Sequence, residues 1–241
     1  MKRFYLRKDT IVFPNRNEEF AELFGILTGD GYVGQYKLPN RIVSAIEIVG
    51  NKLKDFDYIQ GFTLRIIKNL FNITPKLYVR ENQNTVRLII NSKEIVNFLK
   101  EEGFPLGKKG NITPPNWIIN ESKFFSKYVR GIFDTDGYLT LKNKEGKKYP
   151  VIGISSISKP LLNSIKEFLN KLDISSYLGK RVVNNERYKK QLIEYKLQIS
   201  GKKNIFLFFD KIGSNNKRNL LKYNEYMRIR GVEPRTPTSS A

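Results

Sequence analysis

The sequence predicts an α+β protein of two pseudo-symmetric repeats, each with the element order αββαββα and a four-stranded antiparallel sheet with helices on one face. The main observation is a phrase that occurs twice: residues 23–32 read LFGILTGDGY, and residues 129–138 read VRGIFDTDGY. Each copy is an apolar helical run that ends in Asp-Gly and leads into an alternating segment. The equivalent residues Asp30 and Asp136 are 136 − 30 = 106 residues apart. That spacing is the length of a small domain, so the chain is predicted to be a duplication.

The first repeat is predicted to begin with a helix at Asn17, a favourable N-cap residue that is followed by Glu18 and Glu19. Acidic residues in a first turn interact favourably with the positive end of the helix dipole. Apolar residues at helical spacing continue to Gly29. Alternating segments and turn residues then predict, in order, a hairpin over 31–50, a helix over 53–70, a hairpin over 75–91 and a helix over 92–102.

A segment rich in glycine and proline, residues 103–115, separates the repeats. The same order then returns as a helix over 121–135, a hairpin over 137–157, a helix over 159–172, a hairpin over 175–200, and helices over 202–211 and 216–230. We therefore expect an N-terminal repeat at 1–110 and a C-terminal repeat at 111–230. Residues 231–241, rich in Pro, Thr and Ser, are expected to form a disordered tail.

The charge of the chain predicts a polyanionic partner. The 241 residues include 43 Lys+Arg and 23 Asp+Glu, which gives a net charge of +20. Neutralising phosphates releases counterions and favours association, and double-stranded DNA is a pseudo-symmetric substrate that suits two equivalent carboxylates. No apolar run reaches membrane-spanning length and the N-terminus has no signal-peptide core, so no membrane partner is expected. We expect an intracellular nucleic-acid protein.

The absence of two residue types restricts the chemistry. The chain has no cysteine and no histidine. Disulfides, thiolate metal sites, catalytic triads with histidine and histidine-metal sites are therefore excluded. Carboxylates, lysine, arginine, tyrosine and hydroxyl groups are left to perform any chemistry.

Gly25 and Gly131 indicate how the repeats are joined. Each lies within a predicted helix, where glycine costs about 1 kcal/mol relative to alanine. The usual benefit is close backbone approach between two helices, so we expect the first helices of the two repeats to pack on each other.

The ends of these helices predict a metal site. Each end presents a carboxylate, Asp30 or Asp136, and backbone carbonyls, with Gly29 and Thr135 the residues directly before the acids. Such hard oxygen ligands suit Mg²⁺ or Mn²⁺. The alternative is that both Asp-Gly pairs are only hairpin turns. An EF-hand is excluded, because no glutamate follows residues 134–137 at the required spacing.

Both copies resemble the LAGLIDADG motif of homing endonucleases, and the order of elements extends the resemblance over nearly the whole chain. The second copy has Gly131, Asp134, Asp136 and Gly137 in place, whereas the first has Thr28 where the family has its first acidic residue. The resemblance implies a monomeric, two-motif enzyme whose repeats join at a two-helix interface. It also implies a metal-dependent double-strand break in a long asymmetric DNA target, with the final acid of each motif binding the metal.

The resemblance further implies one catalytic basic residue per half, after the second hairpin and its helix. Lys109 and Lys217 are the predicted residues, with Lys108 and Arg218 as the neighbouring alternatives. A polar residue after the second strand often orients water in the family. Asn51 and Ser158 are the candidates for that role.

Base recognition is assigned to the polar faces of the sheets, since long side chains on a twisted ribbon can enter the major groove. Some of these side chains are expected to contact phosphates or only to solubilise the protein. The candidates are Gln35, Lys37, Arg41, Glu47, Arg80, Asn82, Arg87, Lys142, Lys144, Lys148, Arg181, Asn185, Glu194, Lys196 and Gln198.

Two other functions on the same fold are considered: an RNA-splicing maturase and a catalytically inactive DNA-binding protein. Both need the basic surface but not both carboxylates. Because Asp30 and Asp136 are both present, an intron-encoded or free-standing endonuclease is favoured.

Overall fold

The computed structural model describes residues 10–185 and 190–231. The first sheet and its helices comprise α1 (Glu18–Gly29), β1 (Gly31–Leu38), β2 (Arg41–Asn51), α2 (Lys52–Asp57), the π-helical η1 (Tyr58–Thr63), α3 (Leu64–Phe71), β3 (Lys76–Arg80), the 3₁₀ turn η2 (Glu81–Gln83), β4 (Thr85–Ile90) and α4 (Lys93–Glu101). The remaining elements are α5 (Asn116–Ile119), α6 (Ser122–Asp136), β5 (Gly137–Lys144), β6 (Lys147–Ser156), α7 (Lys159–Lys171), β7 (Tyr177–Asn185), β8 (Lys190–Ser200), α8 (Lys202–Lys211) and α9 (Lys217–Ile229).

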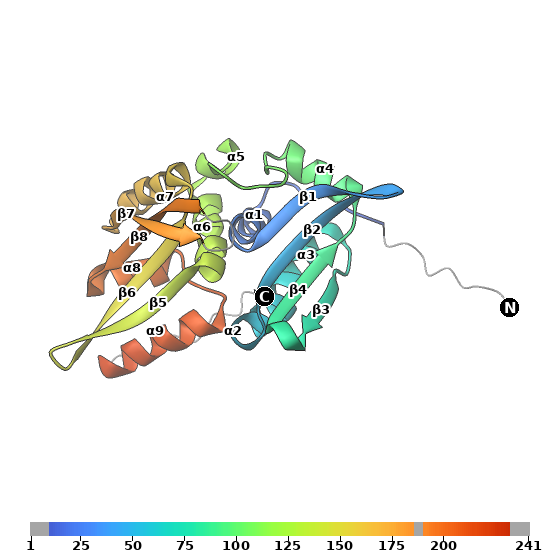
Figure 1. Cartoon of the computed structure of the whole chain (residues 1–241). Helices are drawn as coiled ribbons and strands as arrows, with labels where there is room; N and C mark the ends of the chain where they lie inside the picture. Colours follow the sequence, from blue (N-terminus) through green and yellow to red (C-terminus); the bar gives the residue numbers. More distant parts are fainter. Residues whose placement is uncertain (1–9, 186–189, 232–241) are drawn as a thin grey trace. The chain divides into compact units, whose positions relative to one another are not determined.

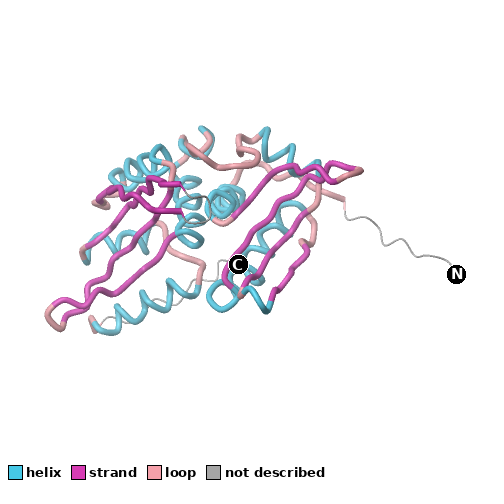
Figure 2. Tube along the Cα trace, viewed as in Figure 1, coloured by secondary structure: helices cyan, strands magenta, loops and turns pink. Residues whose placement is uncertain are grey.

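The two sheets have the same topology, which confirms the predicted repeat architecture. Their strand orders are β1-β2-β4-β3 and β5-β6-β8-β7, and every pair is antiparallel. Helices lie against one face of each four-stranded sheet (Figures 1 and 2). The helix predicted over 53–70 differs, because it is divided into α2, η1 and α3. A π turn adds a residue to one turn, and apolar periodicity over a short segment does not detect that addition.

The chain divides into two compact units. Unit 1 contains Met1–Lys108 and Pro115–Tyr128, and unit 2 contains Lys109–Pro114 and Val129–Ala241. The boundary expected at residue 110 stays a prediction, and the predicted tail at 231–241 lies outside the described residues apart from Gly231.

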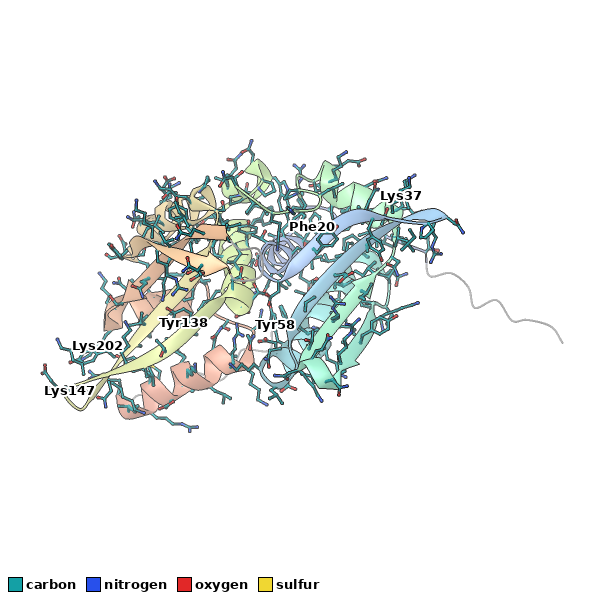
Figure 3. All side chains as sticks on the ribbon, in the orientation of Figure 1. Phe20, Lys37, Tyr58, Tyr138, Lys147 and Lys202 are labelled. Carbon is teal, nitrogen blue, oxygen red and sulfur yellow. The ribbon has the colours of Figure 1, made fainter. Side chains whose placement is uncertain are left out.

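Aromatic packing explains why Pro115–Tyr128 belongs to unit 1. Trp117 stacks on Phe20 with ring centroids 5.4 Å apart and meets Phe24 edge-on at 5.4 Å. Its indole Nε1 donates to the carbonyl of Glu102 at 3.0 Å. Phe20 is fully buried and labelled on α1 in Figure 3, so this segment completes the core over α1.

Unit 2 has a separate core between its sheet and α7–α9. Ile152, Leu197 and Ile199 are buried on the helix-covered side of the sheet. Phe133 from α6 meets Phe208 from α8 edge-on, with ring centroids 4.9 Å apart. None of the described helices is both long enough and apolar enough to cross a membrane.

The glycine of each Asp-Gly pair permits a tight passage from helix to strand. A Cβ on Gly31 would lie 2.5 Å from the Cα of Leu27, and a Cβ on Gly137 would lie 2.5 Å from the carbonyl oxygen of Phe133. Both contacts involve backbone of the residue four positions earlier, in the last turn of the helix. The strand can therefore leave the helix directly only where a side chain is absent.

We expect Gly137→Ala to lower the free energy of unfolding of unit 2 by about 1–3 kcal/mol, because the new methyl group has to displace backbone. Gly110→Ala is the matched control, since its Cβ would meet no atom within 4 Å and its φ is not positive. The control should remain within about 0.5 kcal/mol of the parent protein. Urea unfolding measures both changes, and equal losses would contradict the role given to Gly137.

Candidate functional site

The acidic residue of each motif lies where the first helix passes into the first strand. Asp30 follows α1 directly, is partly buried, and accepts a hydrogen bond on its carbonyl from the Val49 amide at 3.2 Å. Asp136 is the last residue of α6 and Gly137 begins β5. The tight passage therefore fixes both acids at the same position in their repeats.

Asp136 lies in a cationic environment. Asp136 is exposed at the surface, but desolvation by the surrounding protein raises the pKa of its carboxyl above the ordinary value, and the positive charges of Lys109 and Arg218 oppose this rise. Lys109 lies within the range expected for the N-terminal repeat, 1–110, but belongs to unit 2. The segment between the repeats thus brings one predicted basic residue to the acid of the second repeat.

The guanidinium of Arg218 binds the end of α6. Its Nη2 donates to the carbonyls of Asp134 at 3.2 Å, Thr135 at 2.8 Å and Gly137 at 3.1 Å. The last carbonyls of a helix have no partner within the helix, and a cation interacts favourably with that end of the dipole. Arg218, the alternative to Lys217 in the sequence analysis, is the residue that contacts this helix end. The carbonyl of Thr135, a predicted metal ligand, already accepts one hydrogen bond.

Asp134 has a structural role that the sequence analysis did not assign. It is 1% exposed, and its carboxylate accepts hydrogen bonds from the Ser214 hydroxyl and from the Asn215 amide, the latter at 2.7 Å. The Asn216 side chain donates to the carbonyl of Asp134 at 2.9 Å. The first acid of the motif therefore holds the loop that precedes α9.

Thr28 occupies the equivalent place in the first repeat and is also buried. Its hydroxyl donates to the Phe24 carbonyl at 2.8 Å and lies 3.1 Å from the Tyr128 hydroxyl. These partners belong to helices, not to a loop. The two motifs are thus equivalent in backbone path but different in the contacts of their first polar residue.

The acids fit a metal that takes few protein ligands. Among the described residues, no three Asp or Glu side chains are close enough to hold an ion by themselves. Mg²⁺ is usually bound through one or two carboxylates, with water and substrate phosphates as its other ligands. A single carboxylate at each helix end is consistent with that mode of binding.

Strand register defines the uncovered face of each sheet, which we call the open face. In unit 1 the open face carries Arg41, Glu47, Arg80 and Arg87, and the Arg87 guanidinium lies 3.6 Å from the Glu47 carboxylate. Asn82 is exposed in η2, between β3 and β4.

Placing Gln35 and Lys37 on the open face is wrong. They alternate with Tyr36 and share the side of Val33, which is buried. Gln35 donates to the hydroxyl of its cross-strand partner Ser44 at 3.2 Å. Both residues are nevertheless exposed, because this part of the hairpin extends beyond the core.

In unit 2 the open face carries six of the predicted residues: Lys142, Lys144, Arg181, Glu194, Lys196 and Gln198. Arg181 and Glu194 form an ion pair across β7 and β8. Placing Lys148 on this face is wrong, since it lies on the helix-covered side and pairs with Glu225 of α9 at 2.6 Å. Asn185 ends β7, and its side chain is outside the described part of the structure.

The open faces also present tyrosines that the sequence analysis did not select. Tyr32 lies over Gly34, and Tyr138 lies over Gly153, since a Cβ on either glycine would come within 2.4 Å of the tyrosine hydroxyl. The Lys196 ammonium lies 5.0 Å from the centroid of the Tyr138 ring, which is labelled in Figure 3. These flat aromatic side chains, next to cations, are suited to contact sugars and bases.

The open face of unit 2 is also hollowed. Lys142, Tyr177, Gln198 and Ser200 line a depression of about 360 Å³. Its lining combines a cation with hydroxyl and amide groups, which bind phosphate and sugar oxygens in nucleic-acid complexes.

Asn51 and Ser158, the candidates for orienting water, cap helices in the structure. The side chain of Asn51 accepts from the Leu53 and Lys54 amides at 2.9 Å and 3.1 Å. Ser158 is fully buried, accepts from the Leu161 amide at 3.3 Å and donates to the Ile112 carbonyl at 2.7 Å. Both residues therefore have the structural role that N-cap residues usually have.

Residues 124–213 match a family model described as a LAGLIDADG-like domain. An uncharacterized protein of Methanocaldococcus jannaschii is 30% identical over 180 residues, which cover 73% of this chain and 61% of that protein. Glutamine–fructose-6-phosphate aminotransferase of the same organism is 26% identical over 210 residues, or 86% of this chain but only 17% of that protein. The chain thus spans less than two thirds of the length of both relatives.

Among solved structures, the homing endonuclease I-DmoI in complex with DNA and Ca is similar to this chain, with a TM-score of 0.60 and 18% identity. The match covers 86% of this chain and 97% of I-DmoI. The chain therefore contains a LAGLIDADG-like domain and has the two-domain fold of the single-chain LAGLIDADG homing endonucleases.

Proposed function

We propose that the protein is a site-specific DNA endonuclease that makes a metal-dependent double-strand break and acts as a monomer. The observation that carries this proposal is the repetition of one arrangement, an acid at the end of a helix beside a sheet with a polar open face. The net charge of +20 supports a DNA partner. Structures of the similar I-DmoI in complex with DNA and Ca or Mn support both the partner and the use of a divalent ion.

In the proposed mechanism each repeat supplies one carboxylate, Asp30 or Asp136, to hold Mg²⁺ or Mn²⁺. When bound, such an ion polarises the phosphodiester and lowers the pKa of water. The carbonyls of Gly29 and Thr135 stay predicted ligands. Two carboxylates from two unlike repeats suit cleavage of both strands of an asymmetric duplex.

The remaining residues bind and orient the DNA. The open faces supply cations, amides and tyrosines for phosphates and base edges. Lys109 is proposed to neutralise charge that develops on a phosphate, since its own positive charge already acts on Asp136. Lys217 is exposed at the start of α9 and stays a prediction for the same role.

The first test removes the acids one at a time. A target is first selected from a library of random duplexes with Ca²⁺, which supports binding but little turnover. Asp30→Asn and Asp136→Asn should then abolish double-strand cleavage in Mg²⁺ or Mn²⁺ while leaving the affinity for DNA within about tenfold. Asp173→Asn is the matched control, because Asp173 is exposed and has a φ of 59°, which asparagine tolerates well.

Cleavage by the parent protein should stop in EDTA and return when Mg²⁺ is added in excess. Normal cutting by either acid variant would refute the site, and full activity in EDTA would remove the metal from the mechanism.

A second test compares the basic residues near the second acid. Lys109→Met should slow cleavage by about 10²–10³-fold, the usual effect of losing one group that stabilises transition-state charge. Lys217→Met is expected to slow it as well, and Lys171→Met, an exposed change at the end of α7, is the control. Single-turnover rates measure the effects. If Lys109→Met cuts both strands at the parent rate, Lys109 has no catalytic role.

A third test asks which side of the second sheet meets DNA. Lys142 and Lys148 lie on adjacent strands but on opposite faces, so their alanine variants remove the same charge from two sides. Lys142→Ala should reduce the slope of log affinity against log salt by about 0.9, the value for one phosphate contact. Lys148→Ala should leave that slope nearly unchanged. A larger change for Lys148→Ala would show that the helix-covered side binds DNA.

A further inference from the structure

The loop before α9 is fastened to α6 through Asp134. Both carboxylate oxygens of Asp134 are occupied, Oδ1 by the Ser214 hydroxyl and Oδ2 by the Asn215 amide. The side chain is 1% exposed, as is Asn216, whose Nδ2 donates to the Asp134 carbonyl. A buried carboxylate is stable only when it is paired by donors, so this loop and this acid depend on each other.

The same loop determines the position of Arg218. Asn216 is the N-cap of α9, and its Oδ1 accepts from the Arg218 amide at 3.1 Å. From that first turn, the guanidinium of Arg218 reaches the carbonyls at the end of α6. All three hydrogen bonds come from one nitrogen, Nη2, so a single donor group joins the three carbonyls. The chain of contacts thus runs from Asp134 through the loop to Arg218 and back to the backbone on either side of Asp136.

A direct role of Asp134 as a metal ligand conflicts with these contacts. Its two oxygens and its carbonyl all accept hydrogen bonds, and the residue is 1% exposed, so an ion could reach the carboxylate only if the loop at 214–216 moved. Asp136, two residues later, keeps solvent-exposed surface. The two acids of the second motif therefore have separate tasks.

We propose that Asp134 and Arg218 are positioning residues of the second repeat, which together fix the backbone that presents Asp136. The inference rests on the proposed function, in which Asp136 binds the metal. The first repeat has Thr28 in place of Asp134, and the Thr28 hydroxyl contacts Phe24 and Tyr128, which both lie in helices. The contacts from a buried carboxylate to the loop at 214–216 are therefore a feature of the second motif, and the first polar residues of the two motifs have different partners.

The experiment uses the full chain and replaces Asp134 by threonine, which copies the first repeat, and by asparagine, which keeps one oxygen acceptor. Residues that orient metal ligands typically contribute 10–100-fold to metal affinity or activity. Asp134→Thr should therefore raise the Mn²⁺ concentration for half-maximal cleavage by about 10–100-fold, with Asp134→Asn intermediate. The two strands are followed separately. The strand whose cleavage is slowed more should be the same strand as in Asp136→Asn, and not the strand that is slowed more in Asp30→Asn.

Leu162→Ala, a cavity in buried α7 outside this network, is the control for lost stability. It should lower the melting temperature without changing the Mn²⁺ dependence or the strand pattern. Arg218→Met should reproduce Asp134→Thr, because it keeps an unbranched side chain but removes the donor to the three carbonyls.

Hydrogen exchange gives a readout without metal or cleavage. Amides of residues 135–138 should exchange about tenfold faster in Asp134→Thr and Arg218→Met than in Leu162→Ala. Unchanged exchange, or a strand pattern like that of Asp30→Asn, would overturn the inference. If Asp136→Asn itself cleaves normally, the proposed function fails instead, and the exchange result still decides whether the network fixes this backbone.

Discussion

The structure depends on one steric constraint, the passage from helix to strand at Asp-Gly. In both repeats a Cβ on the glycine would lie within 2.5 Å of the last helical turn. Because the strand starts without an intervening loop, the acid before the glycine has almost no freedom of position. The same glycine fixes where the first strand begins. Because side chains alternate along a strand, it also determines which face of the sheet each residue of that strand occupies. The backbone geometry at Asp-Gly thus determines both the position of the acid and the orientation of the strand that follows it.

The conserved geometry supports two different sets of contacts. In the second repeat the buried Asp134 recruits a loop and an arginine, whereas in the first repeat Thr28 stays within the helical packing of unit 1. Burying a carboxylate is costly unless donors meet both oxygens, so Asp134 requires the loop at 214–216. Duplicated sequences can diverge at such positions, because a glycine permits the passage from helix to strand in both repeats, whereas the contacts that stabilise this passage can differ.

Much of the fold follows from the sequence, since the repeated phrase and the alternating segments determine both the order of elements and the sheet class. The wrong or open predictions concern which face of a sheet a strand residue occupies and which way a side chain at the start of a helix points. Gln35, Lys37 and Lys148 lie near hairpin tips, where both sides of the strand are exposed and polarity no longer identifies a face. The choice between Lys217 and Arg218 depends on where α9 begins. One residue turns a side chain by about 100° around the helix axis.

The contacts of Asp134 were beyond sequence reasoning for a different reason. Its partners lie about 80 residues away in the chain, and serine and asparagine are common loop residues that give no signal of pairing. The position of Lys109 is similar, since its place in the chain assigns it to the first repeat but its charge acts on Asp136. Residues brought together by the fold, and not by the motif, therefore place the positive charges of Lys109 and Arg218 near the second acid. Under the proposed function, two unlike repeats in one chain suit an asymmetric DNA target, which presents a different phosphate environment to each half.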